Sequence, residues 1–426
     1  MKRIMDGNEA CSYVSYKFSE VAGIYPITPA SSMSELTDKW SNLGEKNYFN
    51  TSVKVVEMES EAGAIGMVHG ALRNGMLSTT YTASQGLLLM LPNMYKIEGE
   101  LLPGVINVAS RTIATHALSI FGDHQDIYAA RSTGWAMLAS SSVQEVMDLT
   151  GVAHLSAIKS SVPFINFFDG FRTSHELQKV DVIDRDKLYK LIDKNKLNEF
   201  RKKAMNIHMP ATYGSAQNGD IYFQNVEARN SYYDNTFDIV NSYMEEVNKI
   251  TGKDYKPFNY YGSSKATLVI VAMGSVVETI KDTVDYLNKN GYNVGVVNVH
   301  LYRPFSSKYF LKAIPKSVKK IAVLDRCKEA GSYGEPLYLD VCKVLKELDI
   351  KVDVYGGRYG LSSKDTTPSM IKGVYDFINS TNAHSNFTVG IDDDVTNLSI
   401  KYDKFSLPSK KGDASILVYG YGSDGM

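Results

Sequence analysis

The chain has 426 residues, of which 44% are hydrophobic and 22% are charged, and its formal net charge is −1 at pH 7. A length of this order allows two or three domains, and the composition is ordinary for a globular protein. The near-neutral charge implies no polyelectrolyte partner, so nucleic-acid binding has no support. No apolar run is long enough to cross a bilayer, and residues 1–7 are too short and polar for a signal peptide. We therefore expect a cytoplasmic protein that does not bind a membrane.

The first 180 residues alternate between apolar strand-like runs and helix-like segments. Strands are expected over residues 23–25, 53–56, 76–83, 105–110, 136–140 and 164–168. Helices are expected over residues 10–21, 31–43, 62–72, 85–100, 125–131 and 143–158. Repeated strand–helix units predict an α/β fold with a doubly wound parallel sheet. In such a sheet, ligands bind beyond the carboxyl ends of the strands.

Two residues that follow predicted strands lie in positions suited to a ligand. Pro26 and Pro29 each fix their own φ and push the preceding residue to extended geometry, so Thr28 presents its hydroxyl on a stiff loop. Glu61 stands at the mouth of a small, apolar helix, where a buried carboxylate is costly unless it is hydrogen-bonded or takes part in chemistry. The alternative interpretation is that Glu61 is a first-turn acid that complements the helix dipole.

Arg111 lies just past the end of the predicted fourth strand, which is again a ligand-binding position in a parallel sheet. A guanidinium there can hold a carboxylate through two charge-assisted hydrogen bonds. His116 and His124 flank the same loop, and each is more often a packed or capping residue than a catalytic base. Asp123 and Asp126 are interpreted as caps of the helix that follows.

Beyond residue 180 the pattern changes, because lysine and asparagine become frequent and the periodic apolar runs fade. A charged, exposed helix is predicted over residues 184–205. Residues 211–233 are interpreted as an irregular excursion that wraps the surface or contacts a neighbour. We place the end of a first domain, residues 1–255, close to residues 257–264.

A second α/β unit, residues 256–410, follows this boundary. Its predicted strands and helices are residues 267–272, 294–299, 321–324 and 352–355, and residues 276–289, 306–313, 338–347 and 369–378. Gly274 and Ser275 turn the chain into the first of these helices. Such a turn could bind a phosphate at a helix N-terminus, but we favour a structural role.

Cysteine and acidic residues offer no obvious metal framework. Cys11, Cys327 and Cys342 are scattered, so neither a disulfide framework nor an iron–sulfur site can be built from them within one chain. The acidic run at residues 392–394 is interpreted as a solvated loop, because no further carboxylates are spaced as metal ligands.

The last residues, 411–426, are expected to be the truncated start of a third domain. A strand is predicted over residues 414–419, and it runs into a glycine turn of the form G-x-G-x-x-G. The turn includes Gly422, Ser423, Asp424 and Gly425. A turn of this kind normally opens a helix whose N-terminus binds phosphate, and here the sequence stops at Met426 before such a helix.

Six stretches spread along the chain resemble one family. They are residues 24–29, 57–63, 82–90, 117–126, 167–176 and 357–361. Together they are similar to the N-terminal part of pyruvate:ferredoxin (flavodoxin) oxidoreductase, a thiamine diphosphate enzyme. The resemblance implies a pyrimidine-binding-type first domain and a second domain like the C-terminal domain of transketolase. It also implies a homodimer that converts pyruvate and coenzyme A to acetyl-CoA and carbon dioxide, with electrons passed to ferredoxin or flavodoxin.

The resemblance also implies roles for the residues singled out above. Glu61 would hydrogen-bond the far ring nitrogen of the thiamine diphosphate aminopyrimidine and so favour deprotonation of the thiazolium carbon. Thr28 and Arg111 would hold the ketone and carboxylate of pyruvate. The glycine turn at residues 422–425 would begin a domain implicated in coenzyme A binding. The acidic Mg²⁺ motif and the iron–sulfur cysteines of the family are not found in this sequence and would lie in a further C-terminal region.

Two alternatives stay open. The chain could be part of a related 2-oxoacid:ferredoxin oxidoreductase that acts on another 2-oxo acid, because one sequence does not reveal the selectivity pocket. It could also be a truncated, non-catalytic gene product, an interpretation favoured by the lack of cysteine clusters and of the Mg²⁺ motif.

Overall fold

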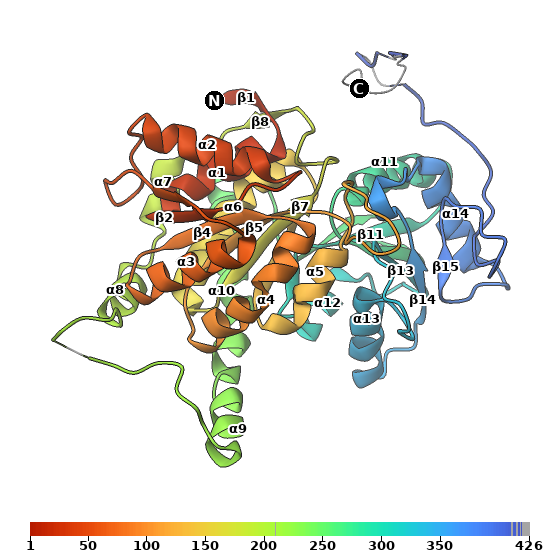
Figure 1. The fold of residues 1–426 in the computed structure, drawn as a ribbon. Coiled ribbons are helices and arrows are strands. Elements are labelled where there is room, and N and C mark those ends of the chain that lie inside the picture. Colours follow the sequence, from red (N-terminus) through yellow and green to blue (C-terminus); the bar gives the residue numbers. More distant parts are fainter. Residues whose placement is uncertain (209, 410–411, 415, 418, 420–426) are drawn as a thin grey trace.

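Two mainly parallel sheets, each flanked by helices, lie side by side in the computed structural model (Figure 1). The structure describes residues 1–208, 210–409, 412–414, 416–417 and 419. The predicted glycine turn at residues 422–425 therefore lies outside the described residues. The described part of the predicted 414–419 strand forms no strand.

The first sheet has seven strands in the order β12-β6-β7-β5-β4-β2-β3. Their bounds are β2 Val21–Ile24, β3 Lys54–Glu57, β4 Ser78–Thr82, β5 Val105–Ser110, β6 Ala136–Ser140, β7 Phe164–Asp169 and β12 Leu301–Arg303. All neighbours are parallel except β12, which pairs antiparallel with β6 at the edge. The chain runs from β2 to β3 on one side and then to β4 on the other, so the strand order reverses beside β2. A crevice for ligands is expected at such a reversal.

Helices cover both faces of this sheet. Their bounds are α1 Gly7–Phe18, α2 Ser31–Asn42, α3 Glu61–Arg73, α4 Ser84–Gly99, α5 Gln125–Ala130 and α6 Val143–Ser160. Helix α6 packs against α1 and α10, and every residue of α6 except Gln144 and Lys159 is buried. Helix α3 packs against α4 and β2. The helix that follows Glu61 was predicted to be buried, and this holds for one face only: Ala64, Ile65 and Val68 are buried, whereas Ala62 and Gly70 are exposed.

The region after residue 180 differs from its prediction. The helix expected over residues 184–205 is two helices, α7 Arg185–Lys190 and α8 Lys194–Lys202, because the Asp193 side chain accepts hydrogen bonds from the first amides of α8 and so starts a new helix. Where the excursion was expected, α9 Gly219–Glu227 and the start of a 22-residue helix are found.

That long helix, α10 Asn230–Thr251, was not predicted. It packs on α6 through buried residues that recur at helical spacing. They are Phe237, Val240, Met244 and Val247. The helix α9 that precedes it projects from the body of the molecule (Figure 1) and has no buried residue. Two short strands, β1 Lys2–Met5 and β8 Gln178–Asp181, also form an unpredicted antiparallel pair.

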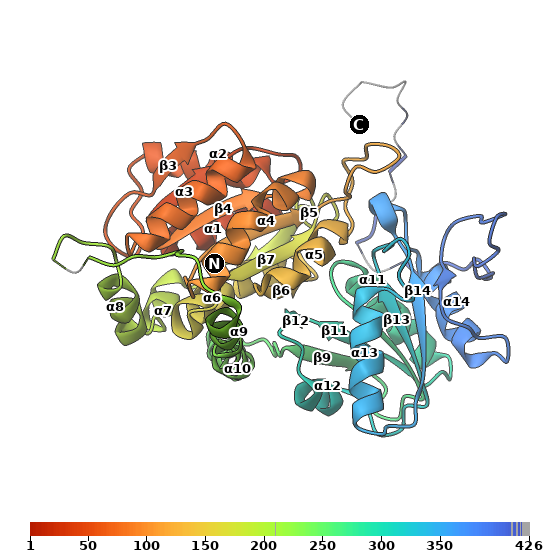
Figure 2. The ribbon, with the colours of Figure 1, turned by 60° about the horizontal axis from the view of Figure 1, so that its bottom comes forward.

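The second sheet has six strands in the order β15-β14-β13-β10-β11-β9. Their bounds are β9 Phe258–Gly262, β10 Leu268–Ala272, β11 Val294–Val299, β13 Lys320–Asp325, β14 Asp353–Arg358 and β15 Phe387–Thr388. The flanking helices are α11 Val276–Lys289, α12 Ser307–Ala313, α13 Pro336–Glu347 and α14 Pro368–Asn379. Helices α11 and α14 pack together (Figure 1), and α13 packs on β13 (Figure 2). Strand β9 occupies the predicted boundary and is antiparallel to β11.

The two halves of the chain are connected through strand β12 and a buried polar cluster. Strand β12 belongs to the second half of the chain but pairs with β6 at the edge of the first sheet. The division into domains at residues 1–255 and 256–410 therefore stays a prediction. In the cluster, Asp169 accepts a 2.7 Å hydrogen bond from the Ser275 amide and lies 2.9 Å from Nη1 of Arg326 and 2.5 Å from Nε2 of His124. Burial would raise the pKa of Asp169, but the charges of Arg326 and His124 outweigh it and hold that pKa well below its ordinary value.

The turn at Gly274 and Ser275 is therefore occupied by a protein carboxylate. Gly274 has φ of +76°, and a Cβ there would lie 2.9 Å from Oδ2 of Asp169. Ser275 begins α11 with its amide and hydroxyl donated to that same carboxylate. The role of this turn is structural.

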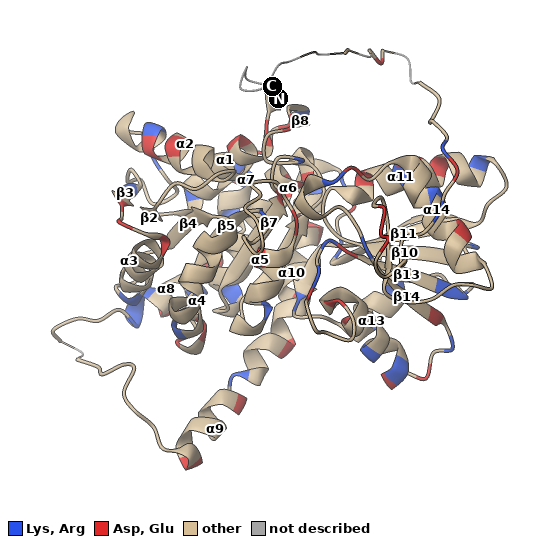
Figure 3. Cartoon of the chain, turned by 45° about the vertical axis from the view of Figure 1, so that its right-hand side comes forward, with Lys and Arg blue, Asp and Glu red and all other residues tan. Residues whose placement is uncertain are grey.

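Charged residues of both signs are distributed over both halves of the molecule (Figure 3). Among the described residues, none of the helices combines the length and the apolar character needed to cross a bilayer.

Candidate active site

The carboxyl ends of four neighbouring parallel strands gather the candidate residues at one edge of the first sheet. Strands β3, β2, β4 and β5 lie side by side in parallel register. The segments that leave their carboxyl ends carry Glu61, Thr28, Ser84 and Arg111 respectively. All four residues therefore lie on the side of the sheet where the strand order reverses, which is where ligands bind in open α/β sheets.

Arg111 and Thr28 are in direct contact. Nη1 of Arg111 donates a 2.8 Å hydrogen bond to the carbonyl oxygen of Thr28, and Nε donates a 3.3 Å bond to the carbonyl of Ser119. The arginine is 7% exposed, and burial lowers the pKa of its guanidinium. Because these two bonds use one Nη1 hydrogen and the Nε hydrogen, the other Nη1 hydrogen and Nη2 can still form a two-pronged pair with a carboxylate.

Glu61 is the first residue of α3. The Ser60 side chain accepts a bond from the Gly63 amide and so caps the helix. Glu61 is only 6% exposed, and its side chain lies against Gly86, where a Cβ would come within 2.7 Å of Oε1. The same Cβ would lie 2.5 Å from Oγ1 of Thr82, a buried hydroxyl without a hydrogen-bond partner. Within the described part of the chain, no group donates a hydrogen bond to the Glu61 carboxyl.

Asp126 is a residue whose role the sequence analysis missed. The sequence predicted that Asp126 caps the following helix. Instead, Asp126 lies within the first turn of α5 and is fully buried. Its Oδ2 accepts hydrogen bonds from the amides of Ser84 at 2.8 Å and Arg111 at 2.9 Å, and Oδ1 accepts one from Ile127 at 2.8 Å. Burial raises the pKa of Asp126 to about 7, although these amides act in the opposite direction. The carboxyl therefore joins the start of α4 to the end of β5.

The two histidines near this loop have different surroundings. His116 is exposed, and its ring contacts only the hydroxyl of Thr115 among the hydrogen bonds of described residues. His124 is 1% exposed and is paired with Asp169, which agrees with the packed role favoured from sequence. Asp123 accepts a 3.0 Å bond from the Gln125 amide near the start of α5, and burial raises its pKa to about 6.

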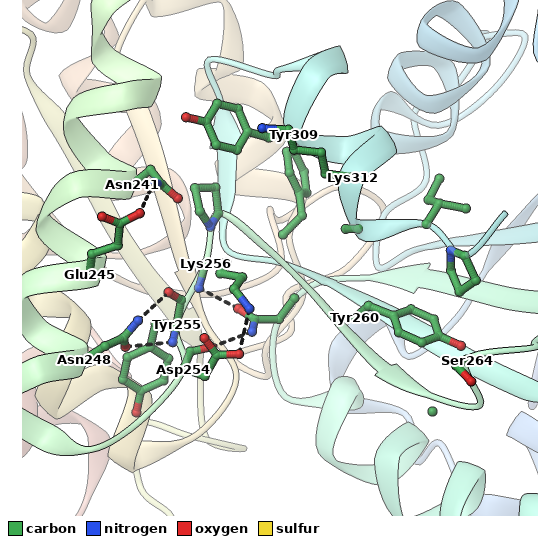
Figure 4. Close-up of a pocket in the computed structure, with 17 residues that line it drawn as sticks. Asn241, Glu245, Asn248, Asp254, Tyr255, Lys256, Tyr260, Ser264, Tyr309 and Lys312 are labelled. Atoms are coloured by element: carbon green, nitrogen blue, oxygen red, sulfur yellow. Dashed lines mark hydrogen bonds and ion pairs between the residues drawn. The ribbon is translucent and has the colours of Figure 1, made fainter.

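A separate groove of about 820 Å³ lies between α10, the segment that follows it and α12 (Figure 4). Its polar groups mostly bond one another: Asn248 and Tyr255 exchange two hydrogen bonds of 2.9 and 2.7 Å, and Lys256 pairs with Asp254 at 2.7 Å. None of Thr28, Glu61 and Arg111 lines it. The groove is therefore distinct from the candidate site.

Among the described residues, no three His, Cys, Asp or Glu side chains gather as metal ligands. The three cysteines are free thiols, and burial raises the pKa of Cys11 to about 12, which disfavours its thiolate.

A solved structure of 2-oxoglutarate:ferredoxin oxidoreductase from Magnetococcus marinus, with 2-oxoglutarate, coenzyme A and succinyl-CoA bound, shares this fold. The TM-score is 0.63 at 19% identity, over 87% of this chain and 64% of that one. This likeness shows a shared α/β fold, and a family model that matches residues 13–245 makes it one of the thiamine diphosphate-binding type.

Sequence comparison then gives the family. Residues 13–245, more than half of the chain, match the model "Pyruvate flavodoxin/ferredoxin oxidoreductase, thiamine diP-bdg", and residues 266–371 match "Pyruvate:ferredoxin oxidoreductase core domain II". The chain belongs to the pyruvate flavodoxin/ferredoxin oxidoreductase family. It is 55% identical to the pyruvate-flavodoxin oxidoreductase of Enterobacter agglomerans over 99% of its length, and 55% identical to the pyruvate:ferredoxin oxidoreductase of Moorella thermoacetica over 100%. The chain spans 36% of the length of each of these relatives.

Proposed function

We propose that this chain supplies the pyruvate pocket and the cofactor-activating acid of a pyruvate:ferredoxin or flavodoxin oxidoreductase. The reaction is the oxidative decarboxylation of pyruvate to acetyl-CoA and carbon dioxide, with two electrons passed to the acceptor protein. The observation that carries the proposal is Glu61, which is 6% exposed, receives no hydrogen bond at its carboxyl from the described residues and lies at the same sheet edge as Arg111.

The residues around Glu61 fit thiamine diphosphate. Glu61 and the unpartnered Thr82 hydroxyl both lie against Gly86, where any larger residue would fill the space beside the carboxyl. When bound, thiamine diphosphate supplies the carbon nucleophile and electron sink that decarboxylation of a 2-oxo acid requires. In the proposal, Glu61 hydrogen-bonds a ring nitrogen of the aminopyrimidine and holds the shared proton at its carboxyl oxygen. Exclusion of water strengthens that bond because the local dielectric is low.

Arg111 and Thr28 are proposed to bind pyruvate. The free edge of the Arg111 guanidinium would receive the substrate carboxylate, and the exposed Thr28 side chain would donate its hydroxyl to the carboxylate or ketone. The contacts of Arg111 with Thr28 and Ser119 already fix the guanidinium, so little side-chain entropy is lost on binding.

The remaining requirements of the reaction are proposed to come from outside the described residues. These are the Mg²⁺ ligands that hold the diphosphate, the iron–sulfur cysteines and the coenzyme A site, for which Gly422, Ser423, Asp424 and Gly425 are the candidates. We also propose a homodimer in the cytoplasm. The free state of all three cysteines supports a reducing compartment.

The test uses an assembled enzyme, made by joining this chain to the part of the Moorella thermoacetica relative that it does not match. We expect pyruvate- and coenzyme A-dependent reduction of ferredoxin or a viologen dye by the assembled enzyme, and none by the purified chain alone. Parallel assays with 2-oxoglutarate and 2-oxobutanoate examine the alternative that another 2-oxo acid is the substrate. Faster reduction with either of them, or dye reduction by the chain alone, would contradict the proposal.

A further inference from the structure

The loop after Arg111 is held by the second half of the molecule. We call residues 112–122 the arginine loop and residues 360–363 the serine loop. The Gly122 amide donates a 2.9 Å hydrogen bond to Oγ of Ser363, and the Ser363 amide donates a 2.8 Å bond back to the Gly122 carbonyl. The hydroxyls of Ser119 and Ser362 form a further short hydrogen bond. Three hydrogen bonds thus connect two otherwise separate loops.

The serine loop has an unusual backbone. Ser362 and Ser363 have φ of +54° and +53°, and Gly360 just before them has φ of +62°. Serine adopts this left-handed region at a cost, and such residues persist only where the surrounding structure holds them there. In this loop, the restraint comes from the bonds to the arginine loop, from Arg172 and from Asp123, whose Oδ2 accepts a 3.4 Å bond from the Ser362 amide. Residues strained in this way gather at binding and catalytic sites.

Ser119 links the serine loop to the guanidinium. Its hydroxyl bonds Ser362, while its carbonyl accepts hydrogen bonds from Nε of Arg111 at 3.3 Å and from the Thr112 hydroxyl at 2.6 Å. Ser362 therefore contacts Arg111 through one intervening residue, Ser119, and a shift of Ser362 would move the guanidinium. Residues 114–118 between Thr112 and Ser119 are exposed, so the contact with Ser362 is one of the few that hold the far end of this loop to the second half of the chain.

Arg172 holds the serine loop from the other side. Its Nη2 donates a 3.1 Å hydrogen bond to the Ser363 carbonyl and a 2.7 Å bond to Asp365. Arg172 follows β7 of the first sheet, so both halves of the chain take part in fixing the serine loop. The rings of Phe121 and Phe171 lie 5.2 Å apart beside this junction, and both residues share a small cavity with Ser362 and Ser363.

We propose that Ser362 and Ser363 are positioning residues for substrate binding, which act from the second half of the molecule through the arginine loop on Arg111. They do not touch the substrate. Their hydrogen bonds to Ser119 and Gly122 set the guanidinium in the orientation that receives the substrate carboxylate. The inference rests on the proposed function, since it takes Arg111 as the carboxylate-binding group.

The first test measures the loop itself in the full chain by amide hydrogen exchange. Ser363→Ala removes the acceptor of the Gly122 amide, and Ser362→Gly removes the bond to Ser119. Each should speed exchange within residues 112–122 by about fivefold, the factor that one ordinary hydrogen bond contributes. Ser317→Ala is the control, because its hydroxyl bonds Ala266 within the second half and should leave this loop unchanged.

The variant Ser362→Gly separates positioning from a merely structural role. Glycine adopts φ of +54° without strain, and this relief offsets the lost bond to Ser119, so the variant should unfold at about the same temperature as the wild type. In the assembled enzyme it should nevertheless raise the KM for pyruvate by about fivefold with little change in kcat. A lower unfolding temperature with unchanged KM would assign Ser362 a purely structural role and overturn the proposal.

A double-mutant cycle tests the path through Ser119. Ser119→Ala and Ser362→Gly break the same hydrogen bond, so the double variant should raise the KM for pyruvate no more than either single variant. Additive effects on KM, or unchanged exchange of the arginine loop, would overturn the inference. If instead Arg111→Lys left KM unchanged while the exchange results held, the proposed role of Arg111 would be wrong and the loop contact would stand.

Discussion

The carbonyl oxygen of Thr28 accepts a 2.8 Å hydrogen bond from Nη1 of Arg111, although the two residues are 83 positions apart in the chain. This bond connects the segment after β2 to the end of β5, across the intervening strand β4. The two residues proposed to bind pyruvate are thus held together before any substrate arrives. Preorganisation of this kind lowers the cost of binding.

Substitution of the proposed cofactor acid should affect turnover. In the assembled enzyme, Glu61→Gln keeps the shape and one hydrogen bond but removes the acid, and general acid–base help is typically worth about 10²–10⁴-fold. We expect kcat to fall by a factor in that range, with a smaller change in the KM for pyruvate. Glu59→Gln is the matched control, since Glu59 is exposed and two residues away. Near-normal turnover of Glu61→Gln would favour the helix-dipole interpretation of this acid.

Substitution of the proposed carboxylate-binding residue should have the opposite pattern. Arg111→Lys keeps the positive charge but loses the planar fork and the bonds to Thr28 and Ser119. Steady-state kinetics should show a KM for pyruvate raised by about tenfold or more, the cost of one charge-assisted bond, with kcat changed less. Arg3→Lys, on the half-exposed pair with Glu9, should leave both constants unchanged.

Asp126 should contribute strongly to stability as well as to the site. Asp126→Ala leaves the buried amides of Ser84, Arg111 and Ile127 without their acceptor. We expect the free energy of unfolding in urea to fall by about 2–5 kcal/mol, because each unsatisfied buried donor costs about 1–3 kcal/mol and water can reach some of them. Asp38→Ala, at an exposed position of α2, should change it by less than about 0.5 kcal/mol. Equal effects would show that the Asp126 bridge is energetically unimportant.

Two of the ion pairs that join the halves of the chain, Asp169–Arg326 and Arg172–Asp365, should differ sharply in strength. Asp169→Asn leaves Arg326 buried without its counter-charge, so the free energy of unfolding should fall by about 3–5 kcal/mol. Asp365 pairs with Arg172 at 2.7 Å, but its side chain is 70% exposed, so Asp365→Asn should cost at most about 1 kcal/mol. Chemical denaturation of both variants measures the contrast, and comparable losses would contradict it.

Stability should fall in acid because of His154. Burial lowers the pKa of this histidine from 6.5 to about 3, so the unfolded chain binds a proton between these pH values and the folded chain does not. The corresponding stabilisation is present above pH 6.5 and is lost as the pH falls toward 3, by up to about 5 kcal/mol.

His154→Gln tests this dependence, because glutamine can keep the hydrogen bond to Ser15 but does not titrate. The free energy of unfolding of the variant should depend less steeply on pH over this range than that of the wild type. Parallel pH profiles of the two proteins would mean that His154 is protonated in the folded state.

Local sequence signals were enough for much of the fold. Strands β5, β6 and β11 and helix α11 have the predicted bounds, because each is an apolar run or an amphipathic segment bounded by turn residues. Helix α10 was missed although Phe237, Val240, Met244 and Val247 have helical spacing, because the surrounding polar residues hid that periodicity. Edge strands such as β9 and β12 are short and carry little pattern of their own.

The family could be inferred from six sequence stretches that resemble it, and the parallel α/β class from the alternation of strand-like and helix-like segments. Thr28, Glu61 and Arg111 could be proposed as site residues from their residue type and their position after a strand. How these residues are held could be seen only in the folded chain. Asp126, Ser362 and the turn at Ser275 act through bonds to backbone groups or to residues far along the chain. Every residue except proline has the same backbone amide, so the sequence does not show which amide a side chain will bond. Such partners can be identified only in the folded chain.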